Sequence, residues 1–299
     1  MNKSSFLAHK TAIYALFILG EAGIIIPYKN GNDKNFLGFL LAVLIGFPII
    51  YLLCILVKKI ENLNKNNYKK YFIAVIYFFV AVFSLSLGVG CFNSFLRFAA
   101  DYILPNASPY LMGIIFSFVI AAVCLSKREA FYKLGLISAV ASAFMLFILF
   151  LFSVPQFNND KIMLLSFPKL KEVSEQALSY LKQTFLPVII LPFFEGFFSK
   201  DNNKKSILKG YIIGSLFLTV CLLNSLLIFG NELSAKLDFP YSEAISTVTA
   251  GNIFMRLDGF SYYVFFMSCL IKIGLSVKLA TELFKRIINL FALKKLPTN

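Results

Sequence analysis

Hydrophobic residues in this chain gather into long continuous runs, separated by short polar stretches, rather than into the stripes of amphipathic elements. We mark eight runs, which cover residues 11–27, 36–57, 71–97, 108–126, 130–154, 179–199, 207–230 and 259–291. A bilayer core about 30 Å thick is crossed by roughly 20 apolar residues in a helix. The pattern therefore predicts an all-α membrane protein with about eight transmembrane helices.

The composition supports this prediction. Of the 299 residues, 59% are hydrophobic and 15% are charged, whereas a soluble domain has roughly 25% charged residues. No composition shift or linker divides the runs, so residues 1–299 are expected to form a single membrane domain. The first run could be a signal peptide, because Lys3 and Lys10 precede it. It continues past Gly20 to Pro27, however, which favours a membrane span.

Few residues suited to catalysis or metal binding are present. The one histidine, His9, lies in the polar N-terminal segment, and no nucleotide-binding motif occurs. The cysteines stand singly in apolar runs, without metal-ligand spacing, and are expected to be buried free thiols: Cys54, Cys91, Cys124, Cys221 and Cys269. We therefore expect no enzyme activity, no cofactor and no metal site.

The net charge of +14 is distributed unevenly between the connections. Lysine and arginine gather at the N-terminus, in alternate connections and in the tail, at residues 58–70, 127–133, 200–209 and 278–295. Because such residues stay on the cytoplasmic side, both termini are expected to be cytoplasmic. The basic charge thus indicates topology and contact with membrane lipids rather than nucleic-acid binding.

Two of the connections predicted to be external are long. Residues 155–178 contain an amphipathic stretch that is expected to lie at the membrane interface. Residues 231–258 contain the turn Asp238-Phe239-Pro240, followed by a short stretch at 241–250 that we expect to be an outer helix.

Two runs contain helix-breaking residues at matching positions. The first run reads FILGEAGIIIP and the sixth reads LPVIILPFFEGFF. The interrupting residues are Gly20, Glu21 and Gly23 in the first, and Pro187, Pro192, Glu195 and Gly196 in the sixth. Unwound backbone at membrane depth must be buried in protein or line a cavity. Two such segments, five spans apart, indicate an inverted-repeat transporter fold with a site between them. The alternative is that these residues only kink or pack the helices.

Three charged residues lie within apolar sequence. A charge at the bilayer centre costs about 2.5–3.5 kcal/mol on insertion scales, so Glu21 and Glu195 need a partner, a cavity or a proton. Either Glu could instead cap a half-helix or lie near the interface. Lys272, in the last run, is a candidate counter-ion for one Glu, or a fixed charge where a sodium ion would sit. Alternatively, Lys272 extends toward the cytoplasm, as we expect of Lys278.

The third run carries a stripe of small residues for which we expect a role in close helix packing. These residues are Ser84, Ser86, Gly88 and Gly90.

Several motifs resemble the spore germination permease family, the GerAB-type B subunits of germinant receptors, within the amino acid–polyamine–organocation superfamily. They are FILGEAGIIIP, FPKLKEVSEQALSYLKQTFLPVIILPFFEG, LLIFGNELSAKLDFPYSEAISTVTAGNIFMRLDGF and CLIKIGL. The most specific feature is FGNELSAKLDFP followed about ten residues later by GNIFMRLDGF. The likeness extends through nearly the whole chain.

The resemblance implies a LeuT-like inverted-repeat fold, with a first repeat at about 11–154 and a second at about 179–292. It implies a multi-pass protein of the cell or spore inner membrane that senses a small-molecule germinant with the receptor A and C subunits. The residues expected to bind the ligand, between broken spans one and six, are Gly20, Glu21, Gly23, Phe193, Phe194, Glu195, Gly196 and Lys272.

The sequence also departs from the family pattern. Family members continue for two further spans, so the second repeat is expected to be incomplete here. Asn93 and Ser94 stand where charged residues are expected in the third span. Three functions therefore stay open: a germinant-receptor membrane subunit, a proton- or cation-coupled amino acid permease, and a non-binding structural pseudo-permease subunit.

Overall fold

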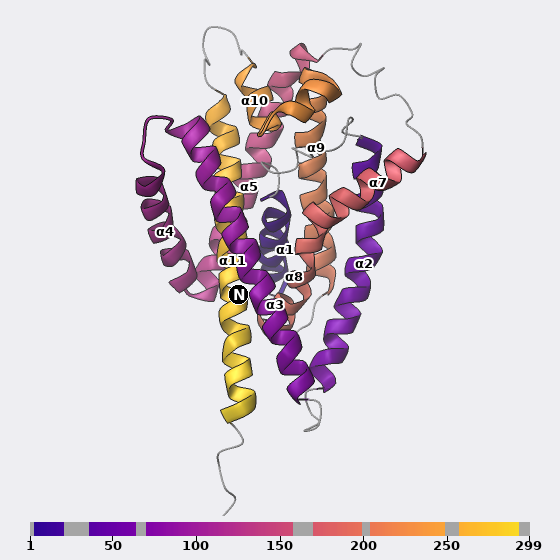
Figure 1. The fold of residues 1–299 in the computed structure, drawn as a ribbon, viewed down its shortest axis with the longest axis vertical. Helices are drawn as coiled ribbons and strands as arrows, with labels where there is room; N and C mark the ends of the chain where they lie inside the picture. Colours follow the sequence, from indigo (N-terminus) through magenta and orange to yellow (C-terminus); the bar gives the residue numbers. More distant parts are fainter. Residues whose placement is uncertain are drawn as a thin grey trace, which may run out of the picture.

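The structure is a computed structural model that describes residues 3–20, 36–63, 70–157, 170–198, 204–248 and 257–292 (Figure 1). Within these residues the regular structure is entirely helical. The α-helices are α1 (Lys3–Leu19), α2 (Phe36–Leu63), α3 (Lys70–Phe98), α4 (Pro109–Leu125), α5 (Arg128–Ser153), α7 (Leu170–Tyr180), α8 (Ile190–Phe198), α9 (Lys204–Lys236), α10 (Pro240–Ser246) and α11 (Asp258–Ala292).

Five helices in the described part are long and apolar enough to cross a membrane, by length and composition. These segments are Phe36–Lys59, Lys70–Ile103, Arg128–Gln156, Lys204–Gly230 and Asp258–Leu290. Two shorter apolar helices, Leu7–Leu19 and Pro109–Leu125, accompany them. The chain therefore has the character of a helical integral membrane protein, as the hydrophobic runs predicted. The full set of eight spans stays a prediction.

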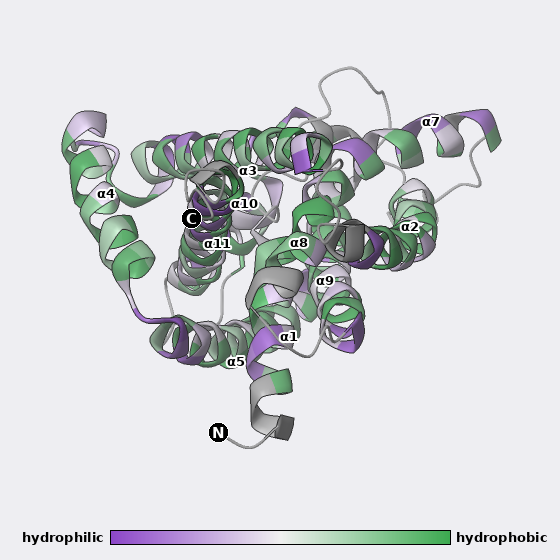
Figure 2. Cartoon of the chain, turned by 90° about the horizontal axis from the view of Figure 1, so that it is seen from below, coloured by the Kyte–Doolittle hydropathy of each residue, from purple (hydrophilic) through white to green (hydrophobic). Residues whose placement is uncertain are grey.

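Helix α1 forms the centre of the bundle. It packs against α5, α9 and α11, and Figure 2 shows it lying between α5 and α9. Its residues from Ala12 to Leu19 are buried on every side, and Ile13, Tyr14 and Ile18 are each 0% exposed. Lys10 of this helix is buried too, although the sequence was interpreted to place it among the surface charges. A helix that is apolar all round belongs in a core.

Two glycines let α9 approach α1 closely. A Cβ atom on Gly210 would lie 2.5 Å from the Cβ of Tyr14, and one on Gly214 would lie 2.8 Å from the carbonyl oxygen of Ala15. The sequence GYIIG is thus a small-xxx-small packing motif of the kind that membrane helices use. The contacts advance along both helices together, so α1 and α9 run parallel here.

The small-residue stripe of α3 is only half used for packing. Ser84 donates a hydrogen bond of 2.8 Å to the carbonyl oxygen of Ser276 on α11. A Cβ atom on Gly88 would lie 3.5 Å from that of the same serine. Ser86 is exposed and bonds within its own helix, and a Cβ atom on Gly90 would meet nothing within 4 Å. The packing prediction is confirmed for Ser84 and Gly88, which face α11. It is wrong for Ser86 and Gly90, because residues two apart face opposite sides of a helix.

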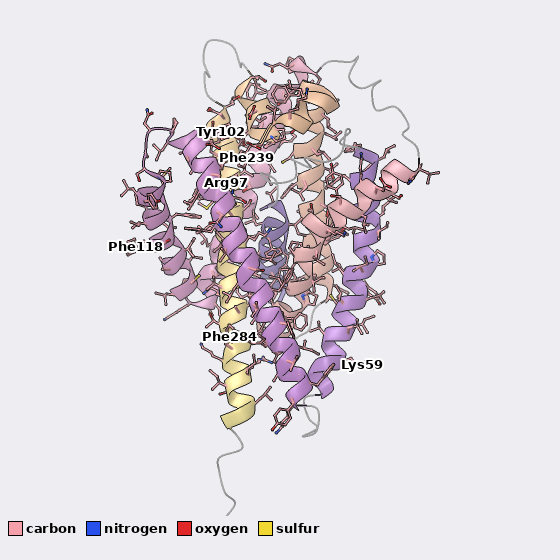
Figure 3. The ribbon with its side chains drawn as sticks, in the orientation of Figure 1. Lys59, Arg97, Tyr102, Phe118, Phe239 and Phe284 are labelled. Atoms are coloured by element: carbon pink, nitrogen blue, oxygen red, sulfur yellow. The ribbon has the colours of Figure 1, made fainter. Side chains whose placement is uncertain are left out.

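The short helix α10 covers one end of the bundle, as the sequence predicted for this region. It packs against α9 and α11, and α9 kinks before it at Gly230, whose φ is 75°. A π-helix, Ala99–Ile103, extends α3 toward it. There the hydroxyl of Tyr102 donates a hydrogen bond to Oε1 of Glu243 on α10. Figure 3 shows Tyr102 beside Phe239 near this end, with ring centroids 5.5 Å apart.

Several helix ends that carry lysine lie toward the same end of the bundle. In Figure 1 the end of α2, the start of α3 and the end of α11 lie at the lower end. Helix α10 and the connection from α3 to α4 lie at the upper end. Lysine-rich segments therefore adjoin one end of the bundle. That this end is cytoplasmic stays a prediction from the positive-inside rule.

Candidate ligand-binding site

Helix α1 ends inside the buried core, at Gly20. The amide of Gly20 donates to the carbonyl oxygen of Leu16 at 2.9 Å and completes the last turn. A Cβ atom here would lie 3.1 Å from the carbonyl oxygen of Ser268 on α11, so only glycine fits without displacing its neighbours. The thiol of Cys269 lies 4.0 Å from the Gly20 carbonyl oxygen, at the limit of a weak hydrogen bond. Within the described residues the helix thus ends at Gly20, and the predicted interruption of the first span at Gly20, Glu21 and Gly23 stays a prediction.

Lys272 lies directly beside that helix end. It is 2% exposed, its stem passes close to Gly20, and its Nζ lies 5.4 Å from the ring centroid of Phe17. A cation is stabilised at the C-terminal end of a helix, where the helix dipole is negative. The interpretation that Lys272 extends to the cytoplasmic surface is wrong, because the side chain is held within the core. Its pairing with Glu21 or Glu195 stays a prediction.

The sixth hydrophobic run is irregular at Pro187, as the sequence predicted, but not at Pro192, Glu195 and Gly196. After α7, the chain forms a π-helix, Leu181–Phe185, and then a 3-10 helix, Leu186–Ile189. Helix α8 then runs without interruption through Glu195 and Gly196. Pro187, which lacks an N–H group, lies in the 3-10 helix. Pro192 is the third residue of α8, where a missing N–H costs little because first-turn amides have no intrahelical acceptor.

Helix α8 contacts α1 through an aromatic pair. Phe194 is 1% exposed and Phe193 is 6% exposed. The ring of Phe194 meets that of Tyr14 edge to face, with centroids 6.3 Å apart. Such pairs contribute about 0.5–1.5 kcal/mol beyond the burial of their surface. The first and sixth hydrophobic runs therefore touch in the structure.

The predicted ligand residues are only partly brought together. Gly20 and Lys272 are in contact, and Phe193 and Phe194 are buried in α8. Glu21 and Gly23 lie outside the described residues. For Glu195 and Gly196 the backbone is described and the side-chain surroundings are not. A role for these residues in binding stays a prediction.

Asn224 of α9 and Tyr241 of α10 form a second polar feature, which was not predicted from the sequence. Asn224 is 0% exposed and Tyr241 is 5% exposed. The amide of Asn224 and the hydroxyl of Tyr241 have no hydrogen-bond partner in the described part of the chain. The hydroxyl of Tyr241 lies beside the side chains of Asn224 and Cys221, outside hydrogen-bonding geometry to either. Buried polar groups are normally paired, and each unpaired one costs about 1–3 kcal/mol.

This pair lies past the end of α1. Gly214 contacts Ile18, and ten further residues of a helix extend about 15 Å. Asn224 therefore lies beyond Gly20, on the side where α10 covers the bundle. The signal in the sequence was a single amide within an apolar run, CLLNSLLIF.

The chemistry of the pair is that of a neutral hydrogen-bonding site. An asparagine amide offers both donors and an acceptor, and a neutral phenol offers one donor and acceptor sites. Burial raises the pKa of Tyr241 well above its usual value, so the hydroxyl stays neutral. These groups suit a small polar molecule that both donates and accepts hydrogen bonds.

Comparison of the chain with models of known families, with curated proteins and with solved structures found no match in any of the three. Assignments finer than a helical membrane protein therefore depend on the sequence motifs and on the residues described above.

Proposed function

We propose that this chain is the membrane subunit of a spore germinant receptor that binds a small polar germinant, such as an amino acid, next to the end of α1. The conformational change that follows ligand binding passes to the receptor A and C subunits. The observation that carries the proposal is the end of α1 within the core, where Gly20 meets the buried Lys272. The role in germination is proposed from the resemblance of the sequence motifs to germination permeases.

The polar groups around this helix end match the functional groups of an amino acid. The ammonium of Lys272 favours a carboxylate, and the negative end of the α1 dipole favours an ammonium group. Beyond the helix end, Asn224 and Tyr241 provide donors and acceptors that have no hydrogen-bond partner among the described residues. A purely structural helix bundle would gain stability by replacing these groups with apolar ones.

Helix α10 provides a route from ligand to signal. It carries Tyr241 and is held to α3 by the hydrogen bond between Glu243 and Tyr102. Gln156 also donates to the carbonyl oxygen of Thr247, at 3.1 Å, immediately after α10. A ligand that binds one position of α10 with 100-fold preference shifts the equilibrium by about 2.7 kcal/mol.

The proposal is tested by the thermal stability of the purified chain in lipid nanodiscs, with each of the common L-amino acids as a probe. A ligand at about 100 times its Kd stabilises by roughly 2.7 kcal/mol, which raises the Tm by several degrees. We expect such a rise for a subset of amino acids, its loss in Asn224→Leu, and its retention in Asn93→Leu, which alters an exposed amide of α3. A rise that persists in Asn224→Leu would place the site elsewhere.

A cation-coupled permease is the second candidate, and the buried Lys272 favours it. A cation fixed beside a helix end inside the membrane is suited to coupling with ion or proton movement. Uptake of radiolabelled amino acids into proteoliposomes that contain this chain alone distinguishes the two. The receptor proposal predicts no accumulation driven by a proton gradient, and robust accumulation would establish the permease instead.

A further inference from the structure

A polar cavity of about 270 Å³ lies at the turn that joins α4 to α5, against α11. Four cationic side chains line it, from Lys127, Arg128, Lys278 and Lys285, with one carboxylate, from Glu282. It does not include any residue of the proposed germinant site. Such an excess of positive charge in a recess creates a potential that attracts anions.

Lys278 fixes the shape of this cavity. Its Nζ donates hydrogen bonds of 2.8 Å to the carbonyl oxygens of Cys124 and Ser126, at the end of α4. It also lies over the ring of Phe131, at 5.3 Å from the centroid. Lys278 therefore extends to the α4–α5 turn, and its extension toward the cytoplasm stays a prediction. The side chain ties α11 to the turn between α4 and α5.

The positive charges in the cavity repel one another. Arg128 interacts unfavourably with Lys278. Arg128 is also the first residue of α5, whose N-cap, Lys127, makes no side-chain capping bond. The N-terminal amides of a helix favour an anion, as the two cations do. A phosphate group in this recess would relieve the repulsion and bind the helix end.

The surroundings of the cavity indicate a lipid rather than a soluble anion. Leu125, adjacent in sequence to two lining residues, is 86% exposed, and Phe118 on the same helix is 73% exposed. Figure 3 shows Phe118 on the outer side of α4, away from the bundle. On α11, Ile288 is 65% exposed. In a protein of this class such faces contact acyl chains. The loop charges also predict the cytoplasmic side for this turn, where anionic lipids are concentrated.

We propose that this cavity binds the phosphate-bearing headgroup of an anionic phospholipid, with the acyl chains along the exposed apolar faces of α4 and α11. The proposal is independent of the germinant-receptor proposal. It requires only that the chain is an integral membrane protein.

Native mass spectrometry of the full chain, released from detergent after addition of phosphatidylglycerol or phosphatidylcholine, tests the proposal. The test variant is Lys127→Gln/Arg128→Gln, and the matched control is Lys58→Gln/Lys59→Gln, which removes two exposed charges at the end of α2. Lys59 lies near the lower end of the bundle in Figure 3. Each cation near an anionic lipid surface contributes about fivefold in affinity, so two contribute roughly thirtyfold.

We expect phosphatidylglycerol, and not phosphatidylcholine, to remain bound to the unmodified chain and to the control. Retention by the test variant should fall roughly thirtyfold. Equal loss in both double variants would show a diffuse charge effect and overturn the proposal. Displacement of the lipid by inorganic phosphate, at an ionic strength where chloride has no effect, would assign the cavity to a soluble anion and overturn it as well.

A second variant tests the proposal independently if the double variant misfolds. Lys285→Gln alters an exposed residue of α11, far along the chain from the α4–α5 turn, and its matched control is Lys59→Gln. The proposal predicts about fivefold weaker retention of phosphatidylglycerol in Lys285→Gln only. Unchanged retention in a Lys285→Gln protein with an unchanged Tm would contradict it.

Discussion

The side chain of Lys272 lies against Gly20, the residue at which α1 ends. A Cβ atom on Gly20 would lie 3.1 Å from Cδ and 3.4 Å from Cβ of this lysine. Glycine at position 20 thus leaves the space that the buried side chain of Lys272 occupies. The two residues come from opposite ends of the sequence, and their contact defines the proposed binding region.

The first prediction follows from this contact. Gly20→Leu would force Lys272 and the backbone of α11 apart, so we expect a loss of about 1–3 kcal/mol in the free energy of unfolding. Gly90→Leu is the matched control, because a Cβ atom there meets nothing within 4 Å. Its effect should stay within about 0.5 kcal/mol. Thermal denaturation in detergent measures both, and equal losses would contradict the packing described.

The second prediction concerns the charge of Lys272. Lys272→Met keeps the length of the side chain and removes a charge that is buried in the core. We expect loss of the germinant response in a protein that reaches the membrane at normal abundance, because the ligand carboxylate loses its cationic partner. Lys58→Met, on the exposed face of α2, should leave the response unchanged. A normal response in Lys272→Met spores would remove this residue from the site.

The long helices could be predicted from the sequence because each is a continuous apolar run. In the sixth run the predicted interruption is present at Pro187 and absent at Pro192, Glu195 and Gly196, for a physical reason. A helix accommodates Gly196 at a cost of about 1 kcal/mol, so α8 continues through it, whereas Pro187 removes a backbone donor. The irregular backbone therefore precedes the residues that looked most disruptive in the sequence.

The residues that were missed depend on partners from distant parts of the chain. Asn224 is one amide in an apolar run, and its neighbour Tyr241 belongs to another helix. Gly210 and Gly214 allow close packing against α1, which lies about 200 residues earlier in the sequence. Burial of Lys10 likewise depends on the central position of α1. No local pattern carries this information.

The third prediction concerns Asn224 in the absence of ligand. Because its buried amide has no hydrogen-bond partner among the described residues, Asn224→Leu should leave the free energy of unfolding unchanged or raise it by about 1–3 kcal/mol. Ligand-dependent stabilisation should disappear in the same protein. A variant destabilised by several kcal/mol without ligand would show that the amide is satisfied in the native state. Chemical denaturation in detergent provides the measurement.

The fourth prediction concerns the bond between α3 and α10. Tyr102→Phe removes the hydrogen bond to Glu243 and should cost about 1.5–3 kcal/mol, the range for bonds to charged groups. Hydrogen exchange of the amides in α10 should increase as the helix opens more often. The matched variant Tyr110→Phe removes a hydroxyl from a side chain that is 85% exposed, and it should change neither quantity. Unaltered exchange in Tyr102→Phe would contradict the role of this bond.

The germination of spores that lack this chain tests the central claim most directly. Release of the spore-core solute dipicolinic acid is followed after exposure to each of the common L-amino acids. The account predicts that the deletion abolishes the response to some amino acids, that the unmodified chain restores it, and that Lys272→Met and Asn224→Leu proteins of equal abundance do not. A full response to every amino acid in deletion spores of a strain without a second receptor would contradict the account.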